Sequence, residues 1–153
     1  MNKNGFTLIE MTIALAISVI MFNIAAISFV SVERFRIIQC AQVLRTNLRY
    51  CQKNAIEEKR KYDIVIDTYN SLYYIRRSDD SGLLRKISQI NLAKGITIQT
   101  NSSDNSIAYT PQGTSGDACT ITFRGKYYFL EMTVNIGSGR VKLGNLKKLI
   151  QKS

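Results

Sequence analysis

The chain has no histidine and no tryptophan, a single proline, three cysteines, and only 11 acidic residues against 21 basic ones. Histidine is the commonest general base and metal ligand near neutral pH. Its absence excludes Ser-His-Asp and Cys-His catalytic arrangements. A serine or threonine paired with a lysine would be the remaining nucleophile, and no motif marks such a pair. We therefore expect a protein that is not an enzyme and that needs no cofactor.

The three cysteines are Cys40, Cys51 and Cys119, and no two of them form a C-x-x-C pair. A zinc site is therefore not predicted. On one helix, Cys40 and Cys51 would share a face but lie about 16 Å apart along the axis, which is too far for a disulfide. Two alternatives follow: one of them reaches Cys119 and leaves an odd thiol, or all three are small buried apolar residues.

A long uncharged segment follows the N-terminus, from Met11 to Val32. As a helix it would measure roughly 33 Å, close to the hydrocarbon thickness of a membrane. A plain anchor, a secretory signal peptide and an assembling stem all fit that length. Lys3 and the small residues Ala26 and Ser28 suit a signal peptide. Glu10 suits neither of the first two, because a carboxylate within a membrane costs about 2.5–3.5 kcal/mol unless it lies at the headgroups.

The residues Gly5-Phe6-Thr7-Leu8-Ile9-Glu10 and the apolar run behind them resemble the prepilin signature of type IV pilins and type II secretion pseudopilins. The resemblance implies that a prepilin peptidase cleaves between Gly5 and Phe6 and methylates the new amine of Phe6. It divides the chain into a leader (residues 1–5), a transmembrane and filament-core helix (6–32) and a globular domain (33–153).

Glu10 acquires a role in this scheme. Cleavage would create a cationic amine at Phe6, and Glu10 would lie one helical turn beyond it. Glu10 stands near the head of the apolar run without a local partner in the sequence, so we expect it to pair with the amine of a neighbouring subunit, which offsets the burial of both charges and sets the register. Implied partners are other pilins or pseudopilins, the prepilin peptidase, the inner-membrane assembly platform, and membrane lipid before assembly. The implied location is the bacterial cytoplasmic membrane, crossed once with the globular domain outside, and then an extracytoplasmic filament.

Beyond the stem, apolar residues recur at helical spacing, which predicts one helix from about Phe6 to about Lys59 with an amphipathic second half. The predicted core stripe comprises Phe35, Ile38, Ala41, Leu44, Leu48, Cys51 and Ala55.

After Lys61 the pattern becomes typical of strands separated by polar turns. Hairpins are expected at residues 62–77 and across the polar stretch 101–105, and Leu146, Leu149 and Ile150 predict a short terminal helix. The expected fold class is α+β, a long N-terminal helix packed on an antiparallel sheet in a pilin-like domain. The expected strands are 62–68, 72–77, 83–90, 96–100, 106–110, 119–124, 126–136 and 140–144.

The stretches YTPQGTSGDACTITF and TVNIGSGRVKLG resemble the C-terminal region of the GspH/FimT group of minor pilins and pseudopilins. The resemblance implies a subunit that initiates, caps or tunes a filament of a type IV pilus, type II secretion or competence system. The matching residues are Thr110, Pro111, Gly113, Thr114, Ile121, Phe123, Ser138, Gly139, Arg140 and Val141.

Some FimT-like members bind DNA through a Gly-Arg-x-Arg stretch, which corresponds here to residues 139–142, with Lys142 in place of the second arginine. Lysine meets a phosphate only as a point charge. Residues 119–153 hold seven basic residues and one acid, a charge excess that favours phosphate binding. Tyr127, Tyr128 and Phe129 could stack on bases or be ordinary sheet residues. An alternative is that the charges are solvated or face acidic neighbours in a filament. The candidate DNA-binding residues are Arg124, Lys126, Arg140, Lys142, Lys147 and Lys148.

Overall fold

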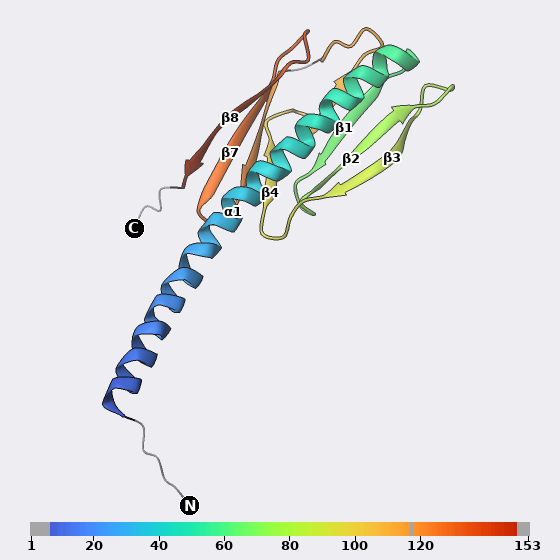
Figure 1. Cartoon of the computed structure of the whole chain (residues 1–153). Coiled ribbons are helices and arrows are strands. Elements are labelled where there is room, and N and C mark those ends of the chain that lie inside the picture. The colour runs from blue at the N-terminus through green and yellow to red at the C-terminus, as the bar shows by residue number, and fades with distance from the viewer. Residues whose placement is uncertain (1–6, 117, 150–153) are drawn as a thin grey trace, which may run out of the picture. The chain divides into compact units, whose positions relative to one another are not determined.

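The computed structural model of the chain describes residues 7–116 and 118–149, and within the helix it describes the side chains of all but residues 24–31. One helix, α1 (Leu8–Glu58), precedes eight strands (Figure 1). Two compact units are distinguished, Met1–Val32 and Glu33–Ser153. The strands are β1 (Tyr62–Asp67), β2 (Leu72–Ser78), β3 (Leu84–Asn91), β4 (Thr97–Thr100), β5 (Ser106–Tyr109), β6 (Cys119–Arg124), β7 (Tyr128–Val134) and β8 (Val141–Lys148).

The strands form two four-stranded antiparallel sheets, in the orders β3-β2-β1-β5 and β4-β6-β7-β8. The fold is therefore α+β as predicted, with two sheets in place of one. The predicted hairpin across residues 101–105 is wrong, because β4 pairs with β6 and β5 pairs with β1. The polar stretch carries the chain between sheets: Asn101 accepts a hydrogen bond from the Thr120 N–H, and the Asn105 carbonyl accepts one from the Ile66 N–H.

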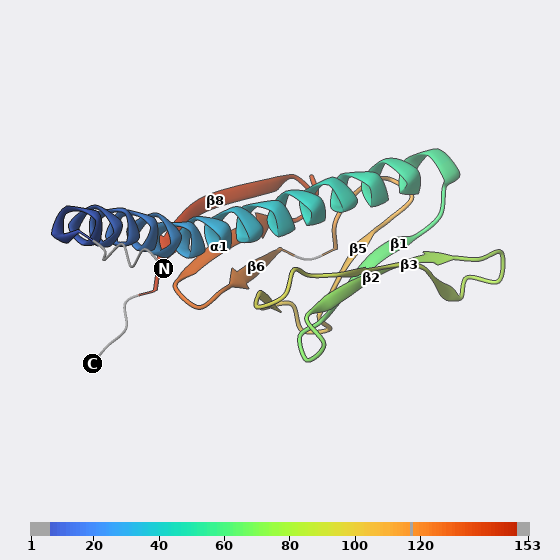
Figure 2. The same ribbon diagram turned by 60° about the horizontal axis from the view of Figure 1, so that its bottom comes forward.

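The core of unit Glu33–Ser153 lies between α1 and the inner faces of both sheets, which the later part of the helix crosses (Figures 1 and 2). The predicted stripe is buried from Ala41 onward, but Ile38 is half-buried and Phe35 is 66% exposed. Ile37 takes the inward position, since it precedes Ala41 by one helical turn. The buried residues of α1 are Ile37, Ala41, Leu44, Leu48, Cys51 and Ala55.

The predicted terminal helix is also wrong, because Leu146 belongs to β8, which extends to Lys148. The pairing of β7 with β8 shifts between Leu130 and Met132, so that Leu143 and Leu146 both lie on the inner side although they are three residues apart. A bulge of this kind inserts an extra residue into a strand and so imitates helical spacing. Gly144 fits there because a Cβ would lie 2.8 Å from the Glu131 carbonyl oxygen. Ile150 lies outside the described residues.

An ion pair joins β1 to β2 within the globular unit. Asp63 is only 2% exposed, and its carboxylate accepts hydrogen bonds from Arg76 Nε at 2.9 Å and Arg76 Nη2 at 2.5 Å. The hydrogen bonds that Arg76 donates to the Asp63 carboxylate raise the pKa of the Arg76 guanidinium above its usual value. A buried carboxylate with two bonds to one guanidinium is satisfied, and it would become costly if the arginine were removed.

In unit Met1–Val32 the described apolar side chains of α1 are exposed, among them Leu8 at 85% and Phe22 at 80% exposure. In the part of the chain that the structure describes, no helix combines the length and the hydropathy needed to span a membrane.

Candidate functional site

The described chain begins with a hydrogen-bonded cap on α1. Thr7 precedes the helix, and both its N–H (2.9 Å) and its Oγ1 hydroxyl (2.8 Å) donate to Glu10 Oε2. In return the Glu10 N–H donates to Thr7 Oγ1 at 3.4 Å and to the Thr7 carbonyl at 3.1 Å. A threonine before the helix and a glutamate three residues later form a capping box. The expectation that Glu10 lacks a local partner is thus wrong.

The cap positions the carboxylate of Glu10 beside Thr7, at the positive end of the helix dipole. Glu10 remains exposed, and within the described residues its hydrogen bonds involve Oε2 alone. Among the residues that the structure describes, none bonds to its second oxygen, Oε1. The predicted cleavage and methylation residues, Gly5 and Phe6, lie outside the described residues.

The basic C-terminal residues separate into two groups in the second sheet. Phe129 of β7 lies on the outer face of this sheet, away from the core. Its neighbours in the strand register are Arg124 of β6 on one side and Lys147 of β8 on the other. Lys142 lies opposite Thr133 on this face, and Arg140 precedes it by two residues and so points the same way. Four of the six predicted DNA-binding residues therefore share one face, which we call the basic face: Arg124, Arg140, Lys142 and Lys147.

The other two residues are placed differently. Lys148 lies opposite Tyr128, which packs against the core, so Lys148 belongs to the inner register. Lys126 lies in the β6–β7 turn, with its Nζ 5.2 Å from the centre of the Tyr127 ring. The three aromatic residues 127–129 are part of this turn and of β7, which fits the sheet alternative.

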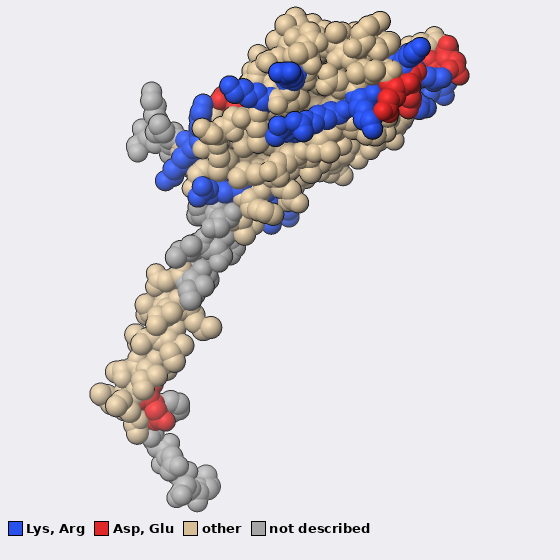
Figure 3. All heavy atoms as spheres, turned by 45° about the horizontal axis from the view of Figure 1, so that its top comes forward, with Lys and Arg blue, Asp and Glu red and all other residues tan. Residues whose placement is uncertain are grey.

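The charges on the basic face are only partly neutralised. Lys147 Nζ lies 3.0 Å from Glu131 Oε2 and 5.6 Å from the centre of the Phe129 ring. Among the described residues, no carboxylate forms an ion pair with Arg124, Arg140 or Lys142. On the face of unit Glu33–Ser153 that Figure 3 shows, basic side chains form bands and acidic ones gather mainly at one end.

Gln52 of α1 holds together the two stretches that resemble the GspH/FimT group. Its side-chain Nε2 donates to the Gly113 carbonyl at 2.8 Å and to the Ser138 carbonyl at 2.9 Å. A Cβ on Gly113 would lie 2.6 Å from Ile56, and one on Gly139 would lie 2.7 Å from the Tyr109 ring. Both glycines also have positive φ angles. These motif residues therefore serve close packing against α1.

Sequence reasoning missed Gln52 and Glu33 as organising residues, because a polar side chain on an amphipathic helix carries no signal of its long-range partner. Glu33 Oε1 accepts the N–H groups of Tyr127 (2.8 Å) and Tyr128 (3.2 Å), which fastens the β6–β7 turn to α1. The Thr7 cap did have a signal, the T-x-x-E spacing.

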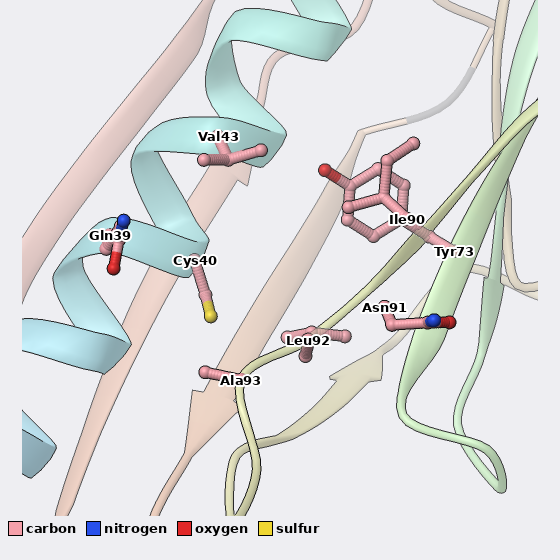
Figure 4. Close-up of a pocket in the computed structure, with 8 residues that line it drawn as sticks. All are labelled: Gln39, Cys40, Val43, Tyr73, Ile90, Asn91, Leu92 and Ala93. Atoms are coloured by element: carbon pink, nitrogen blue, oxygen red, sulfur yellow. The ribbon is translucent and has the colours of Figure 1, made fainter.

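A cavity of about 340 Å³ opens between α1 and the β2–β3 side of the globular unit (Figure 4). The Cys40 sulfur points into it, and the lining is mostly apolar. No disulfide joins the three cysteines, all of which are described. Cys51 and Cys119 are buried, as the small-apolar alternative predicted, while Cys40 is half-buried. Burial, with the nearby Asp63 charge, raises the pKa of the Cys51 thiol to about 12.

Comparisons with known proteins bear on both ends of the chain. Residues 1–22 match the family described as the prokaryotic N-terminal methylation motif. No curated protein matches the chain. Among solved structures, the type IV minor pilin FimU of Pseudomonas aeruginosa is 18% identical, with a TM-score of 0.60, covering 74% of this chain and 91% of FimU. The minor pseudopilin EpsH from the type 2 secretion system of Vibrio cholerae is 14% identical, with a TM-score of 0.61, covering 71% of this chain and 95% of EpsH.

These matches confirm the predicted resemblance at the N-terminus and the predicted pilin-like fold of the globular unit. At such low identity the two solved structures show the shared fold alone.

Proposed function

We propose that this chain is the precursor of a minor pilin or pseudopilin, a structural subunit that is cleaved between Gly5 and Phe6, methylated on Phe6 and assembled into an extracytoplasmic filament. The observation that carries the proposal is the joint presence of a methylation motif over residues 1–22 and a globular unit with the fold of minor pilins and pseudopilins. Prepilin peptidase, the inner-membrane assembly platform and neighbouring pilins are its proposed partners.

The apolar side chains of the first unit support a membrane stage before assembly. Exposed leucine, isoleucine and phenylalanine along α1 are unfavourable in water, at about 25 cal/mol per Å² of apolar surface. We place residues 6–32 in the lipid of the cytoplasmic membrane, with the globular unit outside, and later in a filament core. Both settings would cover the same side chains.

Glu10 links processing to assembly. Cleavage before Phe6 would leave an amine one residue upstream of the Thr7–Glu10 cap. The cap holds one carboxylate oxygen, and the other is positioned to accept an N-methylammonium group from a neighbouring subunit. Such a pair inside an apolar core offsets the desolvation of both charges and permits only the register in which they meet.

Mass spectrometry and N-terminal sequencing of the protein from its native host test the processing step. We expect a mature chain that starts at Phe6 and carries one extra methyl group on its amine. Gly5→Val should leave the leader attached, because the peptidase needs close access to the backbone before the cleaved bond. A mature start near Phe29, or an intact Met1 in assembled protein, contradicts the proposal.

The filament class is a separate question, since the fold matches a type IV pilus protein and a type II secretion protein alike. Cross-linking in cells followed by mass spectrometry of the cross-linked peptides identifies the neighbouring subunits. Cross-links between this chain and the major subunit of one machine assign the class. Recovery without any pilin-like neighbour contradicts assembly.

DNA binding at a filament tip is a second candidate, favoured by the four cations of the basic face and by the absence of ion-pair partners for three of them among the described residues. In a gel-shift assay with the full chain in detergent, binding should weaken with salt at a slope of about 0.9 per phosphate neutralised. Arg140→Ala with Lys142→Ala should reduce binding, whereas Lys86→Ala with Lys94→Ala, an equal charge change elsewhere, should not. Absence of a shift at low salt removes this candidate.

A further inference from the structure

Strand β8 forms one edge of the second sheet and pairs only with β7 among the described strands. Two hydrogen bonds show which of its backbone groups face β7: Asn135 N–H donates to the Arg140 carbonyl at 3.0 Å, and Leu149 N–H donates to the Tyr127 carbonyl at 2.8 Å. Backbone groups alternate sides along an antiparallel strand. Counting from both ends toward the bulge, four residues direct their N–H and C=O groups away from β7: Val141, Leu143, Leu146 and Lys148.

The surface beside this edge is apolar and incompletely covered. Val141, Leu143 and Leu146 are only partly buried, and they pack against the core together with Ile38 of α1. Strand β8 runs along one flank of α1 in both ribbon views (Figures 1 and 2). A further strand at this edge would hydrogen-bond to β8 and extend the inner face over these side chains.

The flank of α1 on this side is strongly basic. Arg34 lies over the Tyr128 ring at 5.5 Å, and Gln52 bonds the β7–β8 turn, so this flank faces the second sheet. Arg45 and Arg49 lie between them on the same flank by helical spacing. The Arg45 Nε atom is buried and has no hydrogen-bond partner within the described residues. A buried donor of this kind is expected to have an acceptor.

The other edge strands do not combine these features. β3 is exposed on both faces for most of its length, so an added strand would cover little apolar surface. β4 and β5 have four residues each, and the end of β5 is already bridged by Ser115 at Tyr109. β8 is twice as long and carries a half-covered apolar inner face.

We propose that β8 accepts an added β-strand from an acidic partner protein, an extended segment in which apolar and carboxylate side chains alternate. Strand addition to an open edge is a common mode of peptide recognition. Apolar side chains of the guest would cover Leu143 and Leu146, and its carboxylates on the opposite face would lie beside Lys142 and Lys147. One polar residue on the inner face of the guest, in place of an apolar side chain, would satisfy Arg45.

The charge of β8 selects against a second copy of the same strand. Its sequence VKLGNLKK has three lysines and no acid. Pairing two such strands would bring six lysines together next to the arginines of α1, and edge lysines are a known protection against self-association. An acidic strand turns the same charges into attraction. The inference concerns the globular unit and requires neither leader cleavage nor methylation, so it stands or falls independently of the proposed function.

A peptide probe tests strand addition directly. The full chain in detergent is titrated with a fluorescent eight-residue peptide of alternating glutamate and valine, and binding is followed by anisotropy. Two matched peptides are controls: one with lysine for each glutamate, and one with N-methyl groups on alternate amides, which keeps the side chains but blocks edge pairing. We expect binding of the first peptide only. On binding, amide exchange measured by NMR should slow at residues 141, 143, 146 and 148, while the inward-facing amides at 142 and 147 change little.

Variants separate hydrogen bonding from charge. Lys148→Pro removes an outward N–H at an exposed edge position, where proline is tolerated. It should weaken peptide binding about three- to tenfold, the effect of one hydrogen bond. Lys148→Ala removes the charge and keeps the N–H, so it should weaken binding less. Lys142→Ala with Lys147→Ala, which removes the two cations beside the guest carboxylates, should weaken binding about tenfold at low salt, and Lys86→Ala with Lys94→Ala should leave it unchanged.

Four results would overturn the proposal. Equal binding of the N-methylated peptide, or binding without slowed exchange at residues 141, 143, 146 and 148, would reduce the interaction to charge attraction. Equal binding of the lysine peptide would remove the acidic partner. Absence of binding at millimolar peptide, with the fold intact by circular dichroism, would show that this edge is closed.

Discussion

The two units of the chain use the same apolar residue types with opposite results. In unit Met1–Val32, Leu8 is 85% and Phe22 80% exposed, whereas in unit Glu33–Ser153 Leu44 and Phe123 are completely buried. The globular unit supplies both sides of its own core from one helix and two sheets. The described part of the first unit consists of one helix, with no second element to pack against it. Its described apolar side chains therefore remain exposed, and under the proposed function a membrane and then a filament would cover them.

The contrast appears within a single helix. From Ile37 to Ala55 the buried positions of α1 recur every three or four residues, while from Leu8 to Asn23 every described side chain is exposed. Helix formation is thus common to both units, and burial depends on whether sheets are present. Changes in the first unit should alter assembly without altering stability, and changes in the second should do the reverse.

The largest expected effect is that of Glu10→Ala on assembly. The variant should still lose its leader but should fail to enter filaments, because the proposed ion pair with the Phe6 amine of a neighbour is gone. Filaments sheared from cells and probed by immunoblot report incorporation, and thermal unfolding should show an unchanged globular unit. Glu57→Ala, which removes another exposed acid of α1, is the control and should assemble normally. Normal incorporation of Glu10→Ala into filaments would contradict the proposed ion pair and the assembly role of the first unit.

Arg76→Ala should have the largest effect on stability in the globular unit. It leaves the buried Asp63 carboxylate without its partner, which costs about 3–5 kcal/mol of unfolding free energy. Denaturant unfolding measures the loss. Asp80→Ala, which breaks the exposed pair with Arg60, should cost less than about 1 kcal/mol. Similar losses for the two variants would show that burial of Asp63 contributes little.

Gly113→Ala should destabilise the globular unit by about 2–4 kcal/mol, since it combines a strained positive φ with overpacking against Ile56. Gly82→Ala has a similar φ but open space around the added methyl group. It should cost roughly 1–2 kcal/mol, the backbone strain alone. Chemical denaturation of the two variants isolates the packing contribution. Equal losses would show that Gly113 serves backbone conformation only.

Ionisation of the buried side chains of Cys51, Tyr73 and Tyr109 should have the smallest effect on unfolding free energy. It should lower that free energy only at alkaline pH. Burial raises the pKa of Cys51 to about 12 from 9.0, raises that of Tyr73 to about 12 from 10.0, and raises that of Tyr109 further. A folded pKa above the unfolded one gives stability that is complete below the unfolded pKa and declines as pH rises.

Unfolding free energy should therefore be level from pH 7 to 9 and fall steadily between pH 9 and 12. Denaturant unfolding across this range provides the measurement. Cys51→Ala should lower stability at neutral pH through the lost packing, but its decline should begin later, near pH 10, where the tyrosines titrate. An unchanged onset would assign the decline to the tyrosines alone.

Local patterns predicted much of the secondary structure. The apolar spacing predicted a helix ending near Lys59, and α1 ends at Glu58. Each predicted strand has a counterpart within a few residues. Errors arose where a long-range contact overrode the local pattern: a bulge opposite Glu131 made β8 resemble a helix, and the polar stretch 101–105 crosses between sheets where a hairpin was expected.

The candidate sites divide in the same way. The signature from Gly5 to Glu10 could be read from adjacent residues, and a family match over residues 1–22 supports it. The basic residues could be counted but not placed: only the strand register shows that Arg124 and Lys147 share a face and that Lys148 does not. Gln52 carried no local signal, because its partners at Gly113 and Ser138 are 61 and 86 residues away.

The sequence by itself determined where the helix and strands lie, where the apolar N-terminal segment begins, and that an acid stands at its head. These are consequences of spacing and composition over a few neighbouring residues. Tertiary structure decided which strands pair, which charges share a surface, and that β8 forms an edge of the second sheet. Many strands with alternating apolar residues could pair with one another on the basis of their local pattern alone. The actual partners are selected only when the helix and both sheets close around one core.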